Sequence, residues 1–290
     1  MATPMPVEAM TSGEHACLTF SDAEERLDIV AAFVRDGIER GQRIVCLTDG
    51  VSPDDLSAQL ADRHVDAAEP LRRGQLRVEP IELAWGPDGC FTAESLLRSV
   101  TGHLRTAREA GYHGLRVTAD MSWATRPLPG VEQLVVFESA VNELFGDGQL
   151  TAICQYDRQR FDAVTLAVVA DAHPHAVAAA TYHDDPVLRI CRQYSRRGIR
   201  VAGEIDYRSV DALGAALGET LRLDHHLEAN LLQLRFLDAA AAAVILNAAR
   251  ALPGDRRMTV RCGGLVARVL TALGATDVPH LRLVVTNVDA

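Results

Sequence analysis

Short apolar runs alternate with amphipathic stretches along the first part of the chain. The run from His15 to Phe20 has the length and composition of a buried strand, and apolar residues at helical spacing follow it as far as Ile38. Further strand and helix pairs follow, ending with a strand at 150–156 and a helix at 161–172. Such βα repetition predicts a parallel sheet with helices on both faces, and ligands bind such sheets beyond the carboxyl ends of the strands.

A second unit is predicted towards the C-terminus. Alanine-rich and polar residues over 176–186 are typical of a linker. Beyond it, Leu231 to Leu237 indicates a buried strand, Asp238 a helix N-cap and the five alanines that follow a helix. We therefore predict an α/β protein with a disordered tail at 1–14, a parallel-sheet domain at 15–175, the linker, and a smaller α/β domain at 187–290.

Composition argues against several classes of function. The net charge of −10 opposes binding to the phosphate backbone of nucleic acids, and no apolar run reaches membrane-spanning length. The chain contains no lysine, which excludes a Schiff-base lysine and the lysine of a phosphate-binding loop. The N-terminus lacks the pattern of a secretory signal, and the six cysteines show no CxxC spacing, so we expect reduced cysteines in a cytoplasmic protein.

Five motifs follow one another in the first domain. They are His15-x-Cys17, the run from Gly114 to Trp123, Phe137-Glu138-Ser139-x-x-Asn142, the run from Cys154 to Asp157, and His173-Pro174. With them, residues 15–175 resemble the MEDS sensory domain (methanogen/methylotroph, DcmR type). The resemblance implies a RecA/KaiC-like fold that has lost nucleotide chemistry and senses small hydrocarbon-derived molecules. The turn at 20–26 agrees, because it lacks glycine and lysine and its acidic side chains would repel a triphosphate.

Two motifs mark the second domain, Gly203-Glu204-Ile205-Asp206 and Leu234-Arg235-Phe236-Leu237-Asp238. With weaker matches at 263–270 and 273–274, residues 187–290 resemble the STAS domain of anti-sigma factor antagonists. The resemblance implies a small mixed sheet with helices on one side. The partners that it implies are anti-sigma factors with kinase activity or other STAS proteins. The contacts expected with such a partner involve Asp206, Asp238, Ala239 and Ala240.

Ala239 stands where that family normally carries a regulatory serine. A serine in this first helical turn would offer its hydroxyl to a kinase, and a phosphate would add about −1.5 to −2 charges to the partner-facing surface. Alanine excludes phosphorylation at this position and imitates the unphosphorylated state, the form that binds the anti-sigma factor in that family. The alternative interpretation is that Ala239 to Ala243 only begin a good helix.

A ligand pocket in the first domain is expected near the carboxyl ends of its strands. Trp123 would supply an apolar wall, and His15, Glu138 and Tyr156 would orient a polar group. The full candidate set is His15, Cys17, Arg116, Asp120, Trp123, Glu138, Cys154, Tyr156 and Asp157. The alternative is that these are core residues, with Arg116 and Asp120 paired to charges elsewhere.

Metal and enzyme chemistry have weaker support in the sequence. His173-Pro174-His175 and His225-His226 lack carboxylate or cysteine partners at ligand spacing. Cys17 and Cys154 could meet His15 across adjacent strands, but the spacing favours no metal site and no cofactor. No G-x-S-x-G motif and no acid–base pair indicates catalysis, so we expect that the protein is not an enzyme.

Together these patterns favour a cytoplasmic, non-enzymatic signalling regulator. A small molecule bound by the first domain would control partner binding by the second, and a homodimer is compatible with this organisation. We expect neither nucleic acid nor membrane as a partner. Two alternatives are left open: a scaffold or oligomerisation module in a stress-signalling assembly, and a degenerate nucleotide-binding protein.

Overall fold

The computed structural model describes residues 4–86 and 89–286, and the chain divides into two units. The first unit is Met1–Ala178 and the second is Ala179–Ala290. Each contains one six-stranded sheet packed against helices, so the predicted α/β class is confirmed. None of the described helices has both the length and the apolar composition needed to cross a bilayer.

All six strands of the first unit are parallel. They are β1 (His15–Phe20), β2 (Arg43–Thr48), β3 (Leu76–Pro80), β4 (Leu115–Asp120), β5 (Leu150–Asp157) and β6 (His175–Ala176). Their order across the sheet is β3-β2-β4-β5-β1-β6. The predicted parallel sheet is therefore confirmed.

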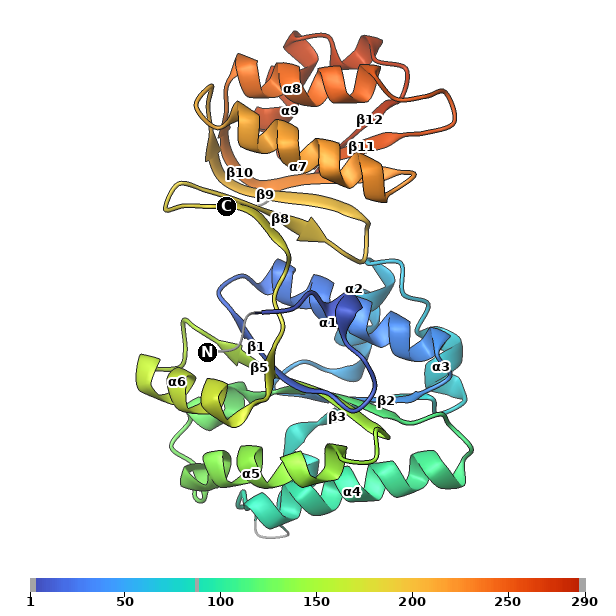
Figure 1. Ribbon diagram of the computed structural model, residues 1–290, viewed down its shortest axis with the longest axis vertical. Helices are drawn as coiled ribbons and strands as arrows, with labels where there is room; N and C mark the ends of the chain where they lie inside the picture. Colours follow the sequence, from blue (N-terminus) through green and yellow to red (C-terminus); the bar gives the residue numbers. More distant parts are fainter. Residues whose placement is uncertain (1–3, 87–88, 287–290) are drawn as a thin grey trace. The chain divides into compact units, whose positions relative to one another are not determined.

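Helices cover both faces of this sheet. They are α1 (Ala23–Glu39), α2 (Pro53–Ala61), α3 (Ala68–Arg72), α4 (Ala93–Glu109), α5 (Leu134–Ala140) and α6 (Ala163–Ala172). In Figure 1, α1, α2 and α3 lie on one side of the sheet and α4 and α5 on the other. Helix α6 packs against α5 and β1. Short 3₁₀ turns join these elements at Val7–Ala9, Ile81–Ala84, Met121–Thr125, Val131–Gln133 and Val141–Phe145.

Side-chain caps explain where several of these helices begin. The carboxylate of Asp22 accepts a hydrogen bond from the amide of Glu25 at the start of α1. Thr92 and Ser95 form a reciprocal capping box at the start of α4. A capped helix with two acidic residues in its first turn thus follows β1, where a phosphate-binding loop would require glycine and a cation.

The second unit contains a mixed sheet with helices on one side (Figure 1). Its strands are β7 (Thr181–Asp184), β8 (Leu188–Gln193), β9 (Gly198–Ile205), β10 (Leu227–Leu237), β11 (Met258–Cys262) and β12 (Leu281–Val285), in the order β12-β11-β10-β9-β8-β7. Its helices are α7 (Val210–Leu223), α8 (Ala239–Arg250) and α9 (Gly264–Ala272), with a 3₁₀ turn at Ala275–Asp277. Strands β7, β8 and β9 pair antiparallel, and β9 to β12 pair parallel.

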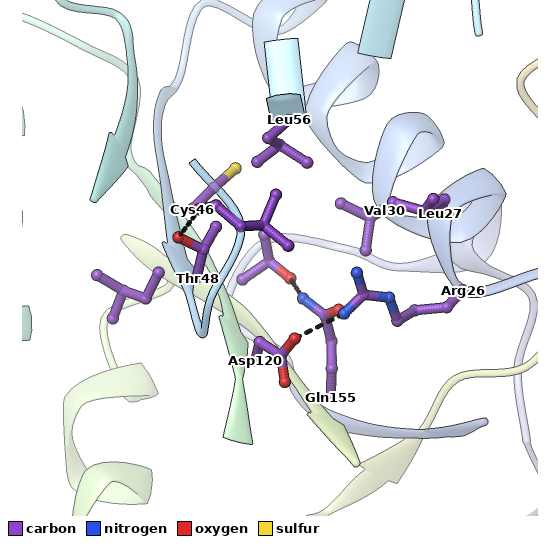
Figure 2. A pocket seen from close by; sticks show the side chains of 11 residues that line it. Arg26, Leu27, Val30, Cys46, Thr48, Leu56, Asp120 and Gln155 are labelled. Carbon is purple, nitrogen blue, oxygen red and sulfur yellow. Dashed lines mark hydrogen bonds and ion pairs between the residues drawn. The ribbon is translucent and has the colours of Figure 1, made fainter. Parts of the chain in front are cut away.

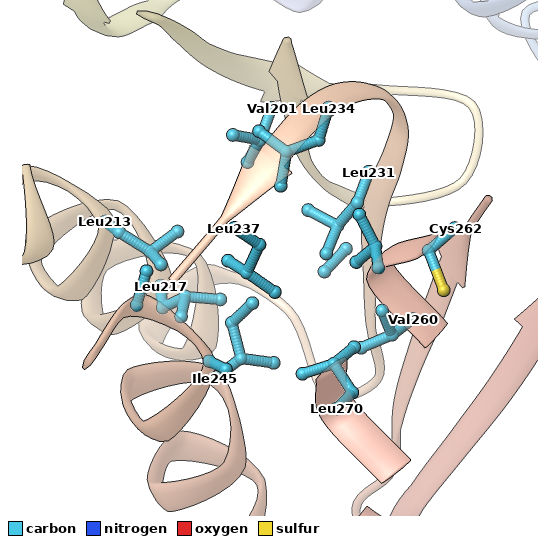
Figure 3. Packing of buried hydrophobic residues seen from close by; sticks show 14 of the residues in the cluster. Val201, Leu213, Leu217, Leu231, Leu234, Leu237, Ile245, Val260, Cys262 and Leu270 are labelled. Carbon is cyan, nitrogen blue, oxygen red and sulfur yellow. The ribbon is translucent and has the colours of Figure 1, made fainter. Parts of the chain in front are cut away.

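The core of this second unit lies between its sheet and its helices. Figure 3 shows inward-pointing side chains of the long central strand meeting those of the helices. The buried residues that it labels include Leu213, Leu217, Leu231, Leu234, Leu237, Ile245, Val260 and Leu270. The predicted buried strand at 231–237 is thus the second half of β10, and Asp238 is the N-cap of α8 as expected.

The chain near both ends of the first unit differs from the prediction. Val7 and Met10 are buried, and the amide of Met5 donates a 2.9 Å hydrogen bond to the carbonyl of Ala176. The described part of the expected disordered tail, 4–14, is therefore packed, because its apolar side chains find a surface to cover. The expected linker at 176–186 also contributes to structure, since it supplies the end of β6 and all of β7.

Candidate functional site

Strand alternation divides the candidate ligand residues of the first unit between two faces of its sheet. Successive side chains of a strand point to opposite faces. His15 and Cys17 on β1 share one face with Cys154 on β5, whereas Asp120 on β4 points to the other. The single pocket expected at the strand ends is therefore wrong, and two separate polar sites take its place.

The first site is a fully buried polar cluster around Glu138. Glu138 lies on α5 with no exposed surface, opposite His15 on β1, Cys154 on β5 and His173 just after α6. Its Oε2 atom lies 3.5 Å from His15 Nε2, 3.3 Å from His173 Nε2 and 3.6 Å from Cys154 Sγ. His15 Nε2 in turn lies 3.5 Å from Cys154 Sγ. We call these four residues the Glu138 centre.

Neighbouring groups fix both imidazole rings of the Glu138 centre. His15 Nδ1 lies 2.8 Å from Asn142 Oδ1, and His173 Nδ1 lies 2.7 Å from the Val169 carbonyl. The amide nitrogen of Asn142 donates to two backbone carbonyls, which orients its oxygen towards His15. Because both Nδ1 atoms face acceptors, each Nδ1 carries a proton, and both Nε2 atoms point at the centre.

Ionisation in the Glu138 centre is shaped by burial. Burial lowers the pKa of His173, which favours the neutral imidazole. Burial acts to raise the pKa of Glu138, but hydrogen bonding to His15 and the charges that both imidazoles can carry outweigh it, so that pKa lies below its usual value. Burial and the Glu138 carboxylate raise the pKa of Cys154 well above the usual thiol value.

Tyr156 completes the surroundings of this carboxylate. Its hydroxyl donates to Glu138 Oε1, leaving Oε2 to face the two histidines and the cysteine. Burial, followed by the charge of Glu138, raises the pKa of Tyr156 well above its usual value, so the phenol stays protonated and remains a donor. Cys17 lies near the same carboxylate, and burial raises its pKa to about 11.

A small apolar cavity adjoins the Glu138 centre. It has a volume of about 20 Å³, and His15 and Cys154 form part of its wall. Leu96, Phe137 and Phe145 supply apolar surface around it. A cavity of this volume holds little more than one water molecule. A larger ligand would therefore require these side chains to move.

The second polar site lies on the opposite face of the sheet (Figure 2). Asp120 accepts a 2.7 Å hydrogen bond from Arg26 of α1, and its other oxygen accepts from the amide of Ser122. Nearby, Gln155 donates a 2.7 Å hydrogen bond to the hydroxyl of Thr118. The cavity between them is also about 20 Å³. Asp120 is therefore paired with the charge of Arg26, and it also lines this cavity.

Arg116 is also a paired residue, held away from both sites. Its guanidinium donates to Gln42 Oε1 at 2.6 Å, to the Phe33 carbonyl at 3.0 Å and to the carboxylate of Asp36. It also lies over the ring of Phe33, 4.7 Å from the centroid. Its side chain is fully buried, so Arg116 joins β4 to α1 and its neighbours.

Trp123 and Asp157 take part in neither polar site. Trp123 is fully buried, with its ring centroid 4.4 Å from that of Phe91 and 5.5 Å from that of Trp85. Asp157 ends β5 and accepts a 2.8 Å hydrogen bond from the amide of Gln159 in the following turn. Trp123 is thus part of an aromatic cluster, and Asp157 is part of a turn.

Three residues of these sites were absent from the predicted ligand set. His173 and Asn142 belong to motifs that the sequence displays, but their partners lie far away in the chain. Arg26 belongs to the segment 20–26, which the sequence predicts as a turn, and its side chain is mostly buried against Asp120. Contacts between distant segments, which no local spacing encodes, bring each of them into place.

In the second unit, Asp238 connects two loops at one end of the sheet. Its Oδ1 atom accepts from the amide of Ala241 at 2.8 Å, and its Oδ2 atom accepts from the amide of Tyr207 at 2.8 Å. Ala239 and Ala240 are exposed at the start of α8. The carboxylate of Asp206 accepts from the amide of Arg208 at 2.9 Å, so backbone hydrogen bonds orient both carboxylates.

An open groove of about 430 Å³ lies beside this turn. Asp206 lines it together with two apolar residues, Val187 and Phe236, which are 53% and 47% exposed. Tyr207, next in sequence to Asp206, is 62% exposed. Exposed apolar and aromatic side chains beside ordered polar groups are typical of protein interaction surfaces.

Comparison with known proteins gives a family for the first unit. Among solved structures, the chain is similar to a KaiC-like protein of Pyrococcus horikoshii OT3 (13% identity, TM-score 0.48, covering 70% of this chain and 93% of that one). It is also similar to the flagellar accessory protein FlaH of Methanocaldococcus jannaschii (10%, 0.43, 63% and 79%). The comparison with curated proteins found no match. Residues 14–174, more than half of the chain, match the MEDS model, the methanogen/methylotroph, DcmR sensory domain, and the chain belongs to this family.

Proposed function

We propose that the chain is a non-enzymatic signalling regulator, whose sensory unit binds a small molecule and whose second unit passes the response to a protein partner. The observation that carries the proposal is the buried Glu138 centre with an apolar cavity beside it, inside a unit of a sensory family. Polar groups converging in an apolar surround can orient a small molecule. Because the cavity is small, binding requires the wall formed by Phe137 and Phe145 to move, which gives the ligand a structural effect.

For the second unit we propose a STAS-like role in binding an anti-sigma factor of the kinase class or another STAS protein. Its mixed sheet with helices on one side, and the turn that Asp238 holds in place, support this role. The groove beside Asp206 adds exposed apolar surface on which a partner can pack. Ala239 keeps the partner-facing turn without a phosphate acceptor, so control passes from phosphorylation to the sensory unit.

Native mass spectrometry of the full chain, purified gently, tests the sensory part of the proposal. The expected result is a species heavier than the chain by the mass of a small organic molecule. The same spectrum gives the number of subunits. If no organic ligand is retained, and none from a panel of small hydrocarbon derivatives shifts the melting temperature, the sensory role of the Glu138 region is wrong. Thermal stabilisation by ATP would instead favour a degenerate nucleotide-binding protein.

Restoring the missing hydroxyl tests the role of the second unit. An Ala239→Ser chain should bind the partner as the natural chain does, and lose that binding once a cognate kinase phosphorylates it. Phosphate at this exposed turn adds charge where the partner approaches. Unchanged binding after phosphorylation would favour the alternative of a scaffold, for which the exposed Val187, Tyr207 and Phe236 provide the surface.

A further inference from the structure

Four donor atoms of the types that bind transition metals meet in the Glu138 centre. They are His15 Nε2, Glu138 Oε2, Cys154 Sγ and His173 Nε2, and all four lie within 4.8 Å of one another. They come from β1, α5, β5 and the residue after α6, and all four residues are buried. The fold therefore brings them together inside the protein, away from competing water.

Four of the six separations between these donors are those expected of ligands around one ion. Zn²⁺ lies about 2.0–2.2 Å from nitrogen or oxygen and about 2.3 Å from sulfur, so neighbouring donors of a tetrahedron are roughly 3.3–3.6 Å apart. The separations from Glu138 Oε2 are 3.3 Å to His173, 3.5 Å to His15 and 3.6 Å to Cys154. His15 Nε2 and Cys154 Sγ are 3.5 Å apart. The other two separations are within 4.8 Å, so small side-chain shifts would let one ion contact all four donors.

The centre places a buried carboxylate against two imidazole Nε2 atoms. When both histidines are neutral, their Nε2 lone pairs face Glu138 Oε2, and the Cys154 thiol beside them is only a weak donor. His173 Nε2 is fully buried and has no hydrogen-bond partner within the described residues. Buried acceptors that face one another are costly unless a cation lies between them.

The surrounding contacts are those that orient metal ligands. Metal-bound histidines usually donate their other ring N–H to a fixed acceptor. Here Asn142 accepts from His15, and the Val169 carbonyl accepts from His173. Tyr156 holds the outer oxygen of Glu138 and leaves the inner oxygen to the centre. Each of these contacts orients its side chain so that one ligand atom faces the centre.

We propose that the Glu138 centre binds one transition-metal ion, with Zn²⁺ as the ion that fits best, through His15, Glu138, Cys154 and His173. Two imidazoles, one carboxylate and one thiolate suit tetrahedral Zn²⁺. On binding, the Cys154 thiol releases its proton to solvent and a bond from zinc to sulfur forms. Two negative ligands then balance the divalent ion, and the buried centre becomes neutral. The site stands on its own geometry, whether or not the second unit binds a partner.

Metal analysis of the full chain, purified without chelators and loaded with Zn²⁺ alone, tests this site. We expect one zinc per chain. Cys154→Ala should lose at least tenfold in zinc affinity. Cys17→Ala is the matched control, because Cys17 is a buried cysteine paired in register with Cys154 but outside the donor set. It should retain the ion. Loss of zinc from the Cys17 variant would overturn the donor set, and a chain that binds no transition metal would overturn the site.

X-ray absorption of the natural zinc-loaded chain gives a second test that needs no variant. The expected first shell has one sulfur at about 2.3 Å and three nitrogen or oxygen atoms at about 2.0–2.2 Å. Replacing zinc with Co²⁺ should give the intense visible bands of a tetrahedral thiolate site. A shell without sulfur, or with two sulfurs, would contradict the proposed ligands, and a six-coordinate spectrum would contradict the tetrahedron.

Discussion

Strand β4 carries apolar side chains on one face and polar side chains, including that of Arg116, on the other. The residues beside it on β4, Leu115 and Val117, belong to the apolar core on the α4 side, whereas Arg116 points to α1. Its guanidinium is fully buried and binds Asp36, Gln42 and a carbonyl. A charge in this position is compatible with folding only because each of these acceptors is in place.

Replacing Arg116 should therefore unfold the first unit more easily. Arg116→Met keeps much of the volume but leaves Gln42 and Asp36 without their buried donor, and we expect a loss of about 3 kcal/mol in the free energy of unfolding. Arg98→Met, at an exposed position on α4, should stay within about 0.5 kcal/mol of the natural chain. Calorimetry on the transition of the first unit distinguishes them. Equal effects would contradict the structural role of Arg116.

A second prediction concerns the contribution of the Tyr156 hydroxyl to stability. Tyr156→Phe removes the donor to Glu138 Oε1 and leaves a buried carboxylate oxygen with one partner fewer. The expected cost is about 1–3 kcal/mol in the free energy of unfolding. Tyr112→Phe, at a half-buried position of the same unit, is the control and should change little. A Tyr156 variant as stable as its control would show that Glu138 does not depend on this hydroxyl.

At the scale of elements, the apolar pattern over 131–145 does not give one regular helix. It divides into a 3₁₀ turn, the seven residues of α5 and a further 3₁₀ turn. Glu138 lies in the α-helical part, and Asn142 follows it by one turn. This short helix carries the carboxylate into the core and also supplies the acceptor that holds His15.

In the second unit, Gly203 allows two neighbouring strands to approach each other closely. Gly203 lies where β9 pairs with β8, at a φ of 104°, and a Cβ there would overlap the carbonyl oxygen of Val187. Gly203→Ala should lower the free energy of unfolding of this unit by more than about 2 kcal/mol. Gly218→Ala, in α7 with open space around it, should be neutral or stabilise by about 0.5–1 kcal/mol. Chemical denaturation followed by circular dichroism measures both, and a tolerated Gly203→Ala would contradict this strand geometry.

A further prediction concerns partner binding at the first turn of α8. Ala239→Asp places a negative charge in the exposed first turn, where it favours the helix but opposes the partner. Asn247→Asp adds the same charge to an exposed position two turns further along α8. We expect binding of the partner to weaken at least tenfold for the first variant and to stay within about twofold for the second. Equal effects would place the partner elsewhere.

Local patterns were sufficient for the elements but insufficient for the sites. Apolar runs predicted most strands of both sheets, and the N-cap at Asp238 was predicted because a cap depends on its neighbours, but the short strands β6 and β7 fell in or beside the expected linker. The face on which a strand residue lies depends on pairing, so Asp120 was grouped with His15 although the sheet separates them. The ligand-type residues of the Glu138 centre span 158 positions between His15 and His173, and no spacing rule detects such a cluster.

At the scale of the whole molecule, the chain joins a unit of a sensory family with a second unit for which we propose a partner-binding role. The first belongs to the MEDS family, and its polar centre lies in the core. The second presents an ordered turn and a groove with exposed apolar residues. Regulation requires that the ligand favour one state of the chain by its differential affinity, and such coupling typically changes a partner's affinity by about 5- to 150-fold.

The affinity of the full chain for its partner, measured with the sensory unit loaded and after the ligand is removed, tests this account most directly. Calorimetric titration against the host's anti-sigma factors and STAS proteins provides the two dissociation constants. If the sensory unit controls partner binding, the affinity changes at least fivefold in the natural chain and does not change in Glu138→Gln, whose centre has lost its charge. Equal affinities for the loaded and unloaded natural chain would contradict it.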